Sequence, residues 1–239
     1  MMARIAWLVS LAAIVVVAFG VQVDRQARKT PSIAIGVPES VRSTAQLPVA
    51  AYALDSGETG RALVEAEKLV RRRPIPAEHL RLLAQAQFAA GELEKGGLTI
   101  QYAAQRGWRD MLAQEAMLRI ALNAGDEAEA ARRYTALFVN QATEDALLIE
   151  LGDIVLAQPG GTGRETLTEI VTGAQRWHSQ FLRRGWRVMP PDAFVEIVAT
   201  SSDRGAVYDC DQLRLGVRSI RTRNADAADK LDGLIATQC

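Results

Sequence analysis

Aromatic residues are scarce in this chain of 239 residues: Phe, Trp and Tyr together make up 5% of it, whereas alanine and leucine are frequent. Such a composition is typical of helices that pack through small side chains. The alternation of apolar and polar residues that marks a β-strand is also almost absent. It occurs from Ser32 to Val37, where Pro31 and Pro38 bracket the run too closely for a central strand. The sequence therefore predicts an all-α fold.

Neither sign of charge prevails, because 28 Lys and Arg residues balance 28 Asp and Glu residues. A general nucleic-acid-binding protein usually carries a clear basic excess, so the balance argues against that class. Histidine occurs only as His79 and His178, and no HExxH, CxxC or carboxylate cluster accompanies either residue. The sequence thus shows no metal site, cofactor motif or catalytic constellation. We expect a protein that is not an enzyme.

One long segment lacks charge altogether. It runs from Ile5 to Val23, nineteen residues that as a helix would be about 28 Å long, close to the hydrocarbon thickness of a bilayer. We expect residues 1–23 to form an uncleaved signal anchor, that is, a transmembrane helix. A signal peptide cut after the segment Ala18-Phe19-Gly20 and a buried core helix remain the alternatives.

The charges that flank this span conflict over its orientation. Arg4 precedes it, whereas Arg25, Arg28 and Lys29 follow it, and the positive-inside rule then favours a cytoplasmic body. However, a four-residue head with one arginine is typical of the start of an export signal.

The chain has only two cysteines, Cys210 and Cys239, both in its last thirty residues. An even count in one small region suits a disulfide in an oxidising compartment, although two buried thiols would be equally ordinary. We expect a single-pass protein of the bacterial inner membrane with a periplasmic body. A body on the cytoplasmic face, or secretion after signal cleavage, is the alternative.

Residues 24–42 are rich in proline, serine and charge, and we expect a linker that holds the body off the membrane. Helical signals begin near Ser43, whose hydroxyl has capping-box spacing with Gln46.

A small residue, a glycine and an acidic residue then recur at a fixed interval. Gly57, Gly91 and Gly125 lie thirty-four residues apart, and each separates two stretches of helical periodicity. Each glycine is expected to end a helix in a left-handed cap, and the acid after it to favour the start of the next helix. The pattern predicts units of two antiparallel helices. Because neither helix can bury its apolar face alone, such units stack into a solenoid.

At this point the chain resembles the tetratricopeptide repeat (TPR) family, in its single-span, membrane-anchored bacterial form. The family has a small residue in the middle of the first helix and another early in the second. The chain has Ala50, Ala84 and Gly152 at the first position, and Ala62, Gly96 and Ala130 at the second. Pro74 matches the proline that often ends a unit, whereas Trp108 and Ala142 depart from it. Leu118 is too large for the middle position of the third unit.

The resemblance implies a right-handed solenoid of antiparallel helix pairs over residues 43–178, with units at about 43–76, 77–110, 111–144 and 145–178. Residues 179–239 would form a helical C-terminal capping region. In the fourth unit, GGTGRET (Gly160 to Thr166) replaces the compact turn. It lacks the lysine and hydroxyl residue of a phosphate loop, whereas Thr162 and Glu165 have capping-box spacing, so a loop and a helix start are expected.

Ligands of the family usually lie in the concave groove lined by the first helices. Carried over by position, the groove residues are Leu54, Arg81, Gln85, Phe88, Glu115, Arg119, Asn123 and Asp153. This mixed lining suits an extended peptide. Proteins of this type commonly serve envelope assemblies, including exopolysaccharide biosynthesis or export. The resemblance therefore implies a non-enzymatic scaffold that binds partner proteins at the bacterial cell envelope.

A second functional class rests on the helix expected from Asp211 onward. Arg214, Arg218 and Arg221 fall on one face of it, at i, i+4 and i+7. This face could bind anionic glycans or lipid headgroups, with Trp177 and Trp186 stacking on sugar rings. The alternative is the solvated outer face of an amphipathic helix.

Overall fold

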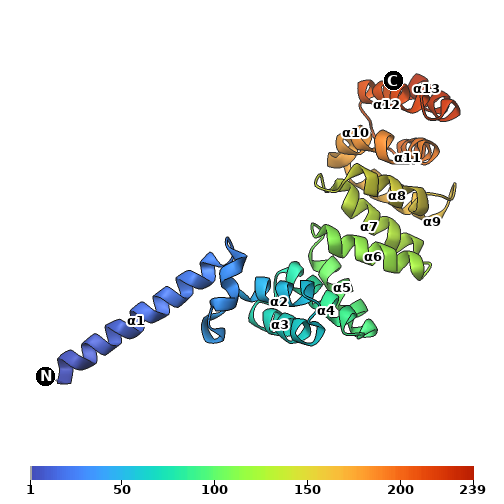
Figure 1. The fold of residues 1–239 in the computed structure, drawn as a ribbon. Coiled ribbons are helices and arrows are strands. Elements are labelled where there is room, and N and C mark those ends of the chain that lie inside the picture. The colour runs from blue at the N-terminus through green and yellow to red at the C-terminus, as the bar shows by residue number, and fades with distance from the viewer. Residues whose placement is uncertain (1) are drawn as a thin grey trace. The chain divides into compact units, whose positions relative to one another are not determined.

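The computed structural model describes residues 2–239, and these residues form 13 α-helices, three 3-10 helices and no strand (Figure 1). The predicted all-α class is confirmed. The chain divides into two compact units, the first ending at Ala113 and the second comprising Gln114–Cys239. We call them unit 1 and unit 2 and describe each by itself.

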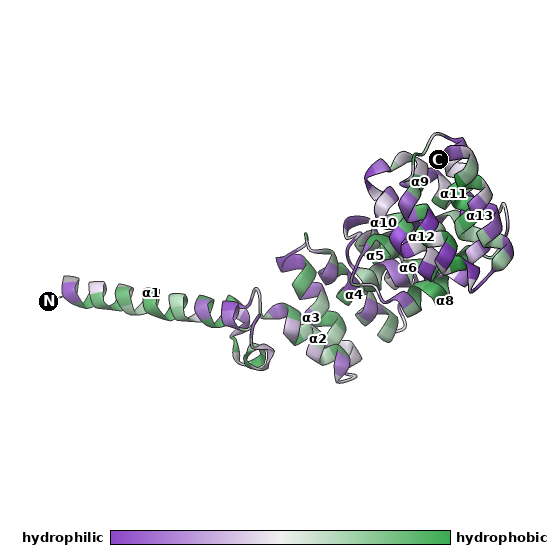
Figure 2. Cartoon of the chain, turned by 90° about the horizontal axis from the view of Figure 1, so that it is seen from above, coloured by the Kyte–Doolittle hydropathy of each residue, from purple (hydrophilic) through white to green (hydrophobic). Residues whose placement is uncertain are grey.

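The N-terminal helix α1 (Met2–Gln26) contains the segment Arg4–Gln26, which is long and apolar enough to cross a membrane. Figure 2 shows apolar residues along most of this helix. None of its most hydrophobic window is buried against the rest of the protein. The alternative of a buried core helix is therefore wrong, because a core helix would be covered.

Two short 3-10 helices and four α-helices follow in unit 1. They are η1 (Pro31–Gly36), η2 (Glu39–Val41), α2 (Gln46–Asp55), α3 (Thr59–Arg72), α4 (Ala77–Ala89) and α5 (Leu93–Arg106). Helix α2 packs against α3 and α4, and α4 packs against α5. The core formed by α2, α3 and α4 is mainly alanine, with Leu69 and Leu82 as its large buried residues. Small side chains let these backbones approach closely, which explains why so few aromatics are needed.

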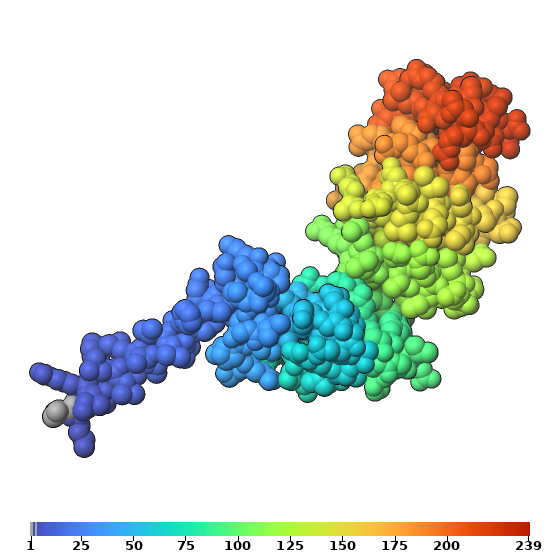
Figure 3. Space-filling model, viewed as in Figure 1, coloured from blue at the N-terminus to red at the C-terminus, as the bar shows by residue number. Residues whose placement is uncertain are grey.

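In unit 2 the helices pack as two alternating sets. Helix α6 (Met111–Asn123) leads into α7 (Glu127–Val139), α8 (Asp145–Val155), α9 (Thr162–Gly173), η3 (Gln175–Trp177), α10 (His178–Val188), α11 (Pro191–Asp203), α12 (Cys210–Arg221) and α13 (Ala225–Gln238). Helix α10 contacts α8 and α12, whereas α9 contacts α7 and α11, and α11 contacts α13. Figure 3 shows the residues of this unit as successive bands of colour in chain order, from green to red. A disulfide joins Cys210 to Cys239 and so links the start of α12 to the end of α13.

The three periodic glycines all adopt positive φ angles, at 73° for Gly57, 79° for Gly91 and 72° for Gly125. The predicted left-handed caps are therefore confirmed. In the first turn, the Glu58 N–H donates to the Ala53 carbonyl and the Gly57 N–H to the Leu54 carbonyl, and the other two turns repeat this pair of bonds. This is the Schellman pattern, which satisfies carbonyls at a helix end. The acidic residue after each glycine is the N-cap of the next helix.

The small residues of the repeat are all buried. Two of them leave no room for a side chain: a Cβ on Gly96 would lie 2.6 Å from the Phe88 ring, and one on Gly152 would lie 2.9 Å from the Tyr134 hydroxyl. Leu118 is also fully buried, so the larger residue is packed inside rather than displaced.

One helix pair falls within each of the four intervals expected from the glycine spacing. Beyond them the chain forms two more pairs, α10 with α11 and α12 with α13. The first helix of these, α10, begins one residue before the region expected to form the helical cap. Phe181, Leu182 and Val188 are buried on its apolar face.

Both predicted capping boxes are wrong. Helix α2 begins at Gln46 without a side-chain cap, and the backbone N–H of Ser43 donates to Asp24 instead. At α9 the N-cap is Gly161, also without a side-chain cap, because Glu196 on α11 accepts the N–H of Gly160. In each case a carboxylate distant in sequence replaces the local cap.

The segment expected to be a linker is folded. Ala27, Ala34, Val37 and Ala45 are buried together with Val49 of α2, and we call residues 27–45 the collar. The Asp24 carboxylate, at the end of α1, accepts N–H bonds from Ser43, Thr44 and Ala45 at 2.7, 2.9 and 2.9 Å. These contacts join the membrane-length helix to α2.

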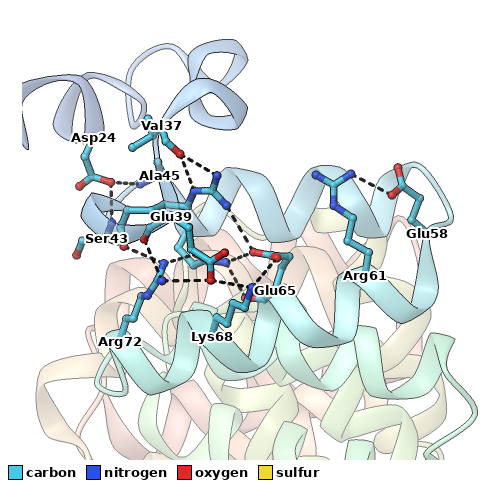
Figure 4. Close-up of polar contacts among 12 residues, drawn as sticks. Asp24, Val37, Glu39, Ser43, Ala45, Glu58, Arg61, Glu65, Lys68 and Arg72 are labelled. Carbon is cyan, nitrogen blue, oxygen red and sulfur yellow. Dashed lines mark hydrogen bonds and ion pairs between the residues drawn. The ribbon is translucent and has the colours of Figure 1, made fainter. Parts of the chain in front are cut away.

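Charged side chains of α3 hold the other side of the collar (Figure 4). Lys68 lies 2.8 Å from Glu39 and 3.2 Å from Glu65. Arg72 donates to the carbonyls of Glu39 and Arg42. Glu65, which is nearly buried, also accepts a 2.6 Å bond from Gln46. The collar is thereby attached to both helices of the first pair.

This network makes the collar sensitive to acid. Burial raises the pKa of Glu65, but hydrogen bonds from Gln46 and Lys68 outweigh it and hold the pKa below its ordinary value of 4.5. A hydrogen bond from Lys68 likewise lowers the pKa of Glu39. Because both pKa values are lowered in the folded state, the stability they contribute is present above pH 4.5 and lost as pH falls through the folded values.

We expect hydrogen-exchange protection of the Val41 and Arg42 amides, which bond to carbonyls within the collar, to fall with acidification below about pH 4.5 in the wild type. In Glu65→Gln this fall should be smaller, because the substituted residue no longer titrates. Glu58→Gln is the control, since Glu58 is exposed and pairs with Arg61 outside the network. A parallel loss of protection in the wild type and Glu65→Gln would show that the network does not hold the collar.

Candidate functional site

The predicted groove residues of unit 1 lie on α2 and α4, and they are used largely for internal contacts. Arg81 forms an ion pair of 3.0 Å with Asp110 and a 3.2 Å hydrogen bond with Gln85. Leu54 packs against the α2–α4 core. The ring of Phe88 lies over Gly96. These side chains are half-buried, which leaves little of each for a ligand.

The remaining groove residues lie on α6 and α8 in unit 2. Arg119 lies 2.9 Å from Glu115 and 3.1 Å from Glu150, so its charge is offset by two carboxylates. The hydrogen bonds to these two groups raise the pKa of Arg119. Asn123 and Asp153 are exposed. The structure brings Glu115 and Arg119 together, therefore, but as partners of each other.

The predicted arginine face of α12 is also partly neutralised. Arg214 pairs with Asp211 at 2.8 Å, and Arg221 pairs with Asp229 at 2.6 Å. Among the described residues, only Arg218 of the three forms no ion pair. The face carries much less net charge than the spacing of its arginines suggests.

The two tryptophans differ in their surroundings. Trp177 is 37% exposed and lies beside Phe138 and Phe181. Trp186 is half-buried, and its ring crosses Gly216 of α12, where an added Cβ would come within 3.1 Å of it. One ring is therefore partly available at the surface, and the other is mainly a contact between helices.

Helices α8, α10 and α12 of unit 2 line a cleft of about 790 Å³. Its walls carry Asp145 at the start of α8, the α10 side chains and two residues of α12. The lining residues are Gln141, Thr143, Asp145, Gln180, Arg183, Arg184, Trp186, Arg187, Gln212 and Leu215. We call this surface the α10 cleft.

The α10 cleft is cationic at its exposed edge. Arg183 and Arg187 lie one helical turn apart and are both exposed. Arg187 lies 3.6 Å from Asp145, and Arg183 forms no ion pair within residues 2–239. Exposed Leu215 supplies an apolar surface opposite them. Polar amides, apolar surface and unbalanced positive charge thus meet in one cleft.

Arg184, between these two arginines, serves a different purpose. Its guanidinium donates to the carbonyls of Phe138, Asn140 and Thr143 and to the Asp145 carboxylate. These groups lie at the end of α7, in the loop that follows it and at the start of α8. Arg184 therefore fixes the loop between α7 and α8 beneath the cleft, whereas Arg183 and Arg187 lie at its exposed edge.

A second cleft of about 740 Å³ lies between α11 and α13. Its main cation, Arg164, is buried and bonded to Asp192 and Glu196 at 2.6 and 2.5 Å. Because these charges compensate one another, this cleft has less to offer a charged ligand than the α10 cleft has.

The two histidines hold backbone rather than forming a reaction centre. A ring nitrogen of His79 lies 2.8 Å from the Arg73 carbonyl, and the two ring nitrogens of His178 lie 3.1 and 2.9 Å from the carbonyls of Val207 and Val171. Within residues 2–239, no three His, Cys, Asp or Glu side chains are grouped to hold a metal ion.

Sequence reasoning missed the α10 cleft. The i, i+4 spacing of Arg183 and Arg187 beside Trp186 was a readable signal, but only for a segment already known to be helical. Comparison of the sequence with protein-family models and with curated proteins finds no match.

Proposed function

We propose that this protein is a membrane-anchored, TPR-like scaffold of the bacterial cell envelope, without catalytic activity, that binds an extended acidic segment of a partner protein in the α10 cleft. The helix pairs of residues 43–178 would form the right-handed solenoid of that family, and residues 179–239 its helical cap. The glycine caps at a 34-residue interval and the buried small residues support this architecture.

The observation that carries the proposed ligand is the composition of the α10 cleft. Arg183 and Arg187 supply positive charge that only Asp145 opposes at the exposed edge. Exposed Gln141 can bond a peptide backbone, whereas the amides of Gln180 and Gln212 already bond the Val139 carbonyl and the Ser179 hydroxyl. Leu215 can contact apolar side chains. An extended peptide needs this combination, because its backbone and its alternate side chains are recognised by different groups. Complementary charge would select an acidic one.

The membrane anchor would bring the α10 cleft close to partners in the same membrane. A span confined to the membrane raises the effective concentration of the cleft for partners in the same membrane. We propose a periplasmic body, and the disulfide between Cys210 and Cys239 supports this orientation because such bonds persist in oxidising compartments.

Fluorescence anisotropy with labelled ten-residue peptides tests the proposal on the full-length protein in detergent micelles. We expect an acidic peptide that alternates Glu with Leu or Tyr to bind, and the same peptide with Gln in place of Glu to bind more weakly. Replacing Arg183 and Arg187 together by alanine should weaken binding of the acidic peptide about tenfold, or about 1.4 kcal/mol.

The matched control replaces Arg214 and Arg218 by alanine, which removes the same charge from α12 outside the cleft. It should leave the affinity nearly unchanged. Equal binding of the acidic and neutral peptides, or equal losses in the two double variants, would contradict the proposed site.

The exposed Trp177 supports one alternative, a glycan- or lipid-binding accessory protein that uses the Arg/Trp surface of unit 2. Sugar rings stack on exposed aromatic faces. Titration of an anionic oligosaccharide against the same variants separates the two functions: binding that depends on Arg214 and Arg218 but not on Arg183 and Arg187 would favour the alternative.

A further inference from the structure

We propose that the collar, residues 27–45, lies in the headgroup region of the lipid bilayer, with Ile35 contacting the edge of the acyl chains. The collar would be a second membrane contact in addition to the span. This inference rests on the proposed function in one respect, because it requires α1 to be inserted in the membrane.

The depth of the collar follows from a contact with α1. Val41 of η2 packs against Gly20, with one methyl 3.3 Å from the position that a Cβ on Gly20 would occupy. Gly20 precedes Val23, the last residue of the apolar run, by three residues, or about 4.5 Å along the helix. Whatever packs against Gly20 lies at the same depth.

The collar cannot easily leave this position. Asp24 is 4% exposed, and its carboxylate accepts three N–H bonds from residues 43–45. Hydrogen bonds to an ionised group are stronger than neutral ones. Ala27, Val37 and Ala45 pack behind them in the collar's apolar cluster. The depth of α1 therefore sets the depth of the collar.

The surface of the collar suits the interface chemically. Ile35 is 50% exposed, although it is a large apolar residue of η1, which contacts α1. The backbone of the 3-10 helices is satisfied internally, as in the bonds from the Val37 N–H to Ala34 and from the Val41 N–H to Pro38. Internal bonding matters where water is scarce, since unsatisfied backbone groups are costly there.

Three exposed cations surround this surface. They are Arg25, Arg28 and Lys29, and none of them forms an ion pair within the described residues. Positive charge next to a span is attracted to anionic headgroups. Their position at the level of Asp24 is where lipid phosphates would lie. The partner indicated by both the apolar and the charged groups is thus a lipid surface.

Brominated-lipid quenching of a fluorophore tests the inference. The full-length chain is prepared as Ser10→Cys, Ile35→Cys or Ser56→Cys, labelled with NBD and reconstituted in phosphatidylcholine–phosphatidylglycerol vesicles. Cys210 and Cys239 are joined and are not labelled without reductant. Position 10 lies within the span, and position 56 lies at the far end of α2, about 15 Å from the Asp24 clamp.

We expect brominated lipids to quench the probe at positions 10 and 35 but not at position 56. Quenching at position 35 should be stronger with bromine near the headgroup end of the acyl chain than with bromine near the bilayer centre. Adding Asp24→Ala should reduce quenching at position 35 and leave position 10 unchanged, since it releases the collar but not the span.

The experiment distinguishes a failure of the proposed anchor from a failure of the inference about the collar. No quenching at position 10 would mean that α1 is not inserted, which would overturn the proposed anchor and this inference with it. Quenching at position 10 combined with equal quenching at positions 35 and 56 would overturn this inference but not the proposed anchor. The span would then stand, and the collar would lie outside the bilayer.

Discussion

Replacing Arg184 by methionine is expected to lower the free energy of unfolding of unit 2 by about 3–5 kcal/mol, the usual effect of removing one partner from a buried charged network. Arg184 is 8% exposed, and its side chain reaches groups 39 or more residues distant in the chain. Methionine keeps much of the apolar volume of arginine, so the loss would reflect the bonds rather than a cavity.

The size of this effect follows from what the guanidinium leaves behind. The carbonyls of Phe138 and Thr143 would stay buried without a donor, and that of Asn140 partly buried; each buried unsatisfied group costs about 1–3 kcal/mol. Two of them lie at the end of α7, where a cation also interacts favourably with the helix dipole.

Arg183→Met is the matched control for this prediction. Arg183 is the preceding residue of the same helix and is exposed, so its replacement should change stability by no more than about 0.5 kcal/mol. The measurement is the urea midpoint followed by circular dichroism on the full-length protein in detergent. Similar midpoints for the two variants would contradict the role given to Arg184.

Replacing Gly163 by alanine has the second large expected effect, a loss of about 2–3 kcal/mol from overpacking. A Cβ at this position would lie 2.1 Å from the carbonyl oxygen of Val155, at the end of α8. The clashing atoms belong to the backbone, so no side-chain rotation can relieve the contact. Helices α8 and α9 would have to separate.

Gly173→Ala provides the comparison on the same helix. No atom lies within 4 Å of the position its Cβ would take. Alanine is preferred over glycine in helices by up to about 1 kcal/mol, so this variant should be neutral or slightly stabilised. Thermal unfolding of both variants measures the difference. A Gly163→Ala protein as stable as Gly173→Ala would show that α8 and α9 do not approach as closely as the structure has them.

Much of the architecture could be predicted because the helix caps are local. A Schellman turn depends on a residue that adopts positive φ and on carbonyls within five residues of it, and Gly57, Gly91 and Gly125 meet this condition by identity and spacing. The same reasoning failed at Ser43 and Thr162. There the competing partners, Asp24 and Glu196, come from other elements.

The candidate site could not be predicted in the same way, because charges choose partners across helices. Arg81 pairs with Asp110 and Arg119 with Glu150, 29 and 31 residues apart. A groove residue selected by position is therefore open to a ligand only if its neighbours do not already bind it. On α10, Arg183 forms no ion pair among the described residues and Arg187 only one of 3.6 Å with Asp145, whereas Arg184 between them is bonded on several sides.

By itself, then, the sequence determined the helical class, the 34-residue rhythm of helix and turn, and one apolar helix long enough to cross a membrane. These depend on side-chain size, backbone freedom and hydrophobicity, which act over a few residues. Only the tertiary structure decided which charged side chains form internal ion pairs, which arginines lie at the edge of a cleft, and that residues 27–45 fold against the end of α1. Those outcomes depend on contacts between residues distant in the chain, and no local pattern records them.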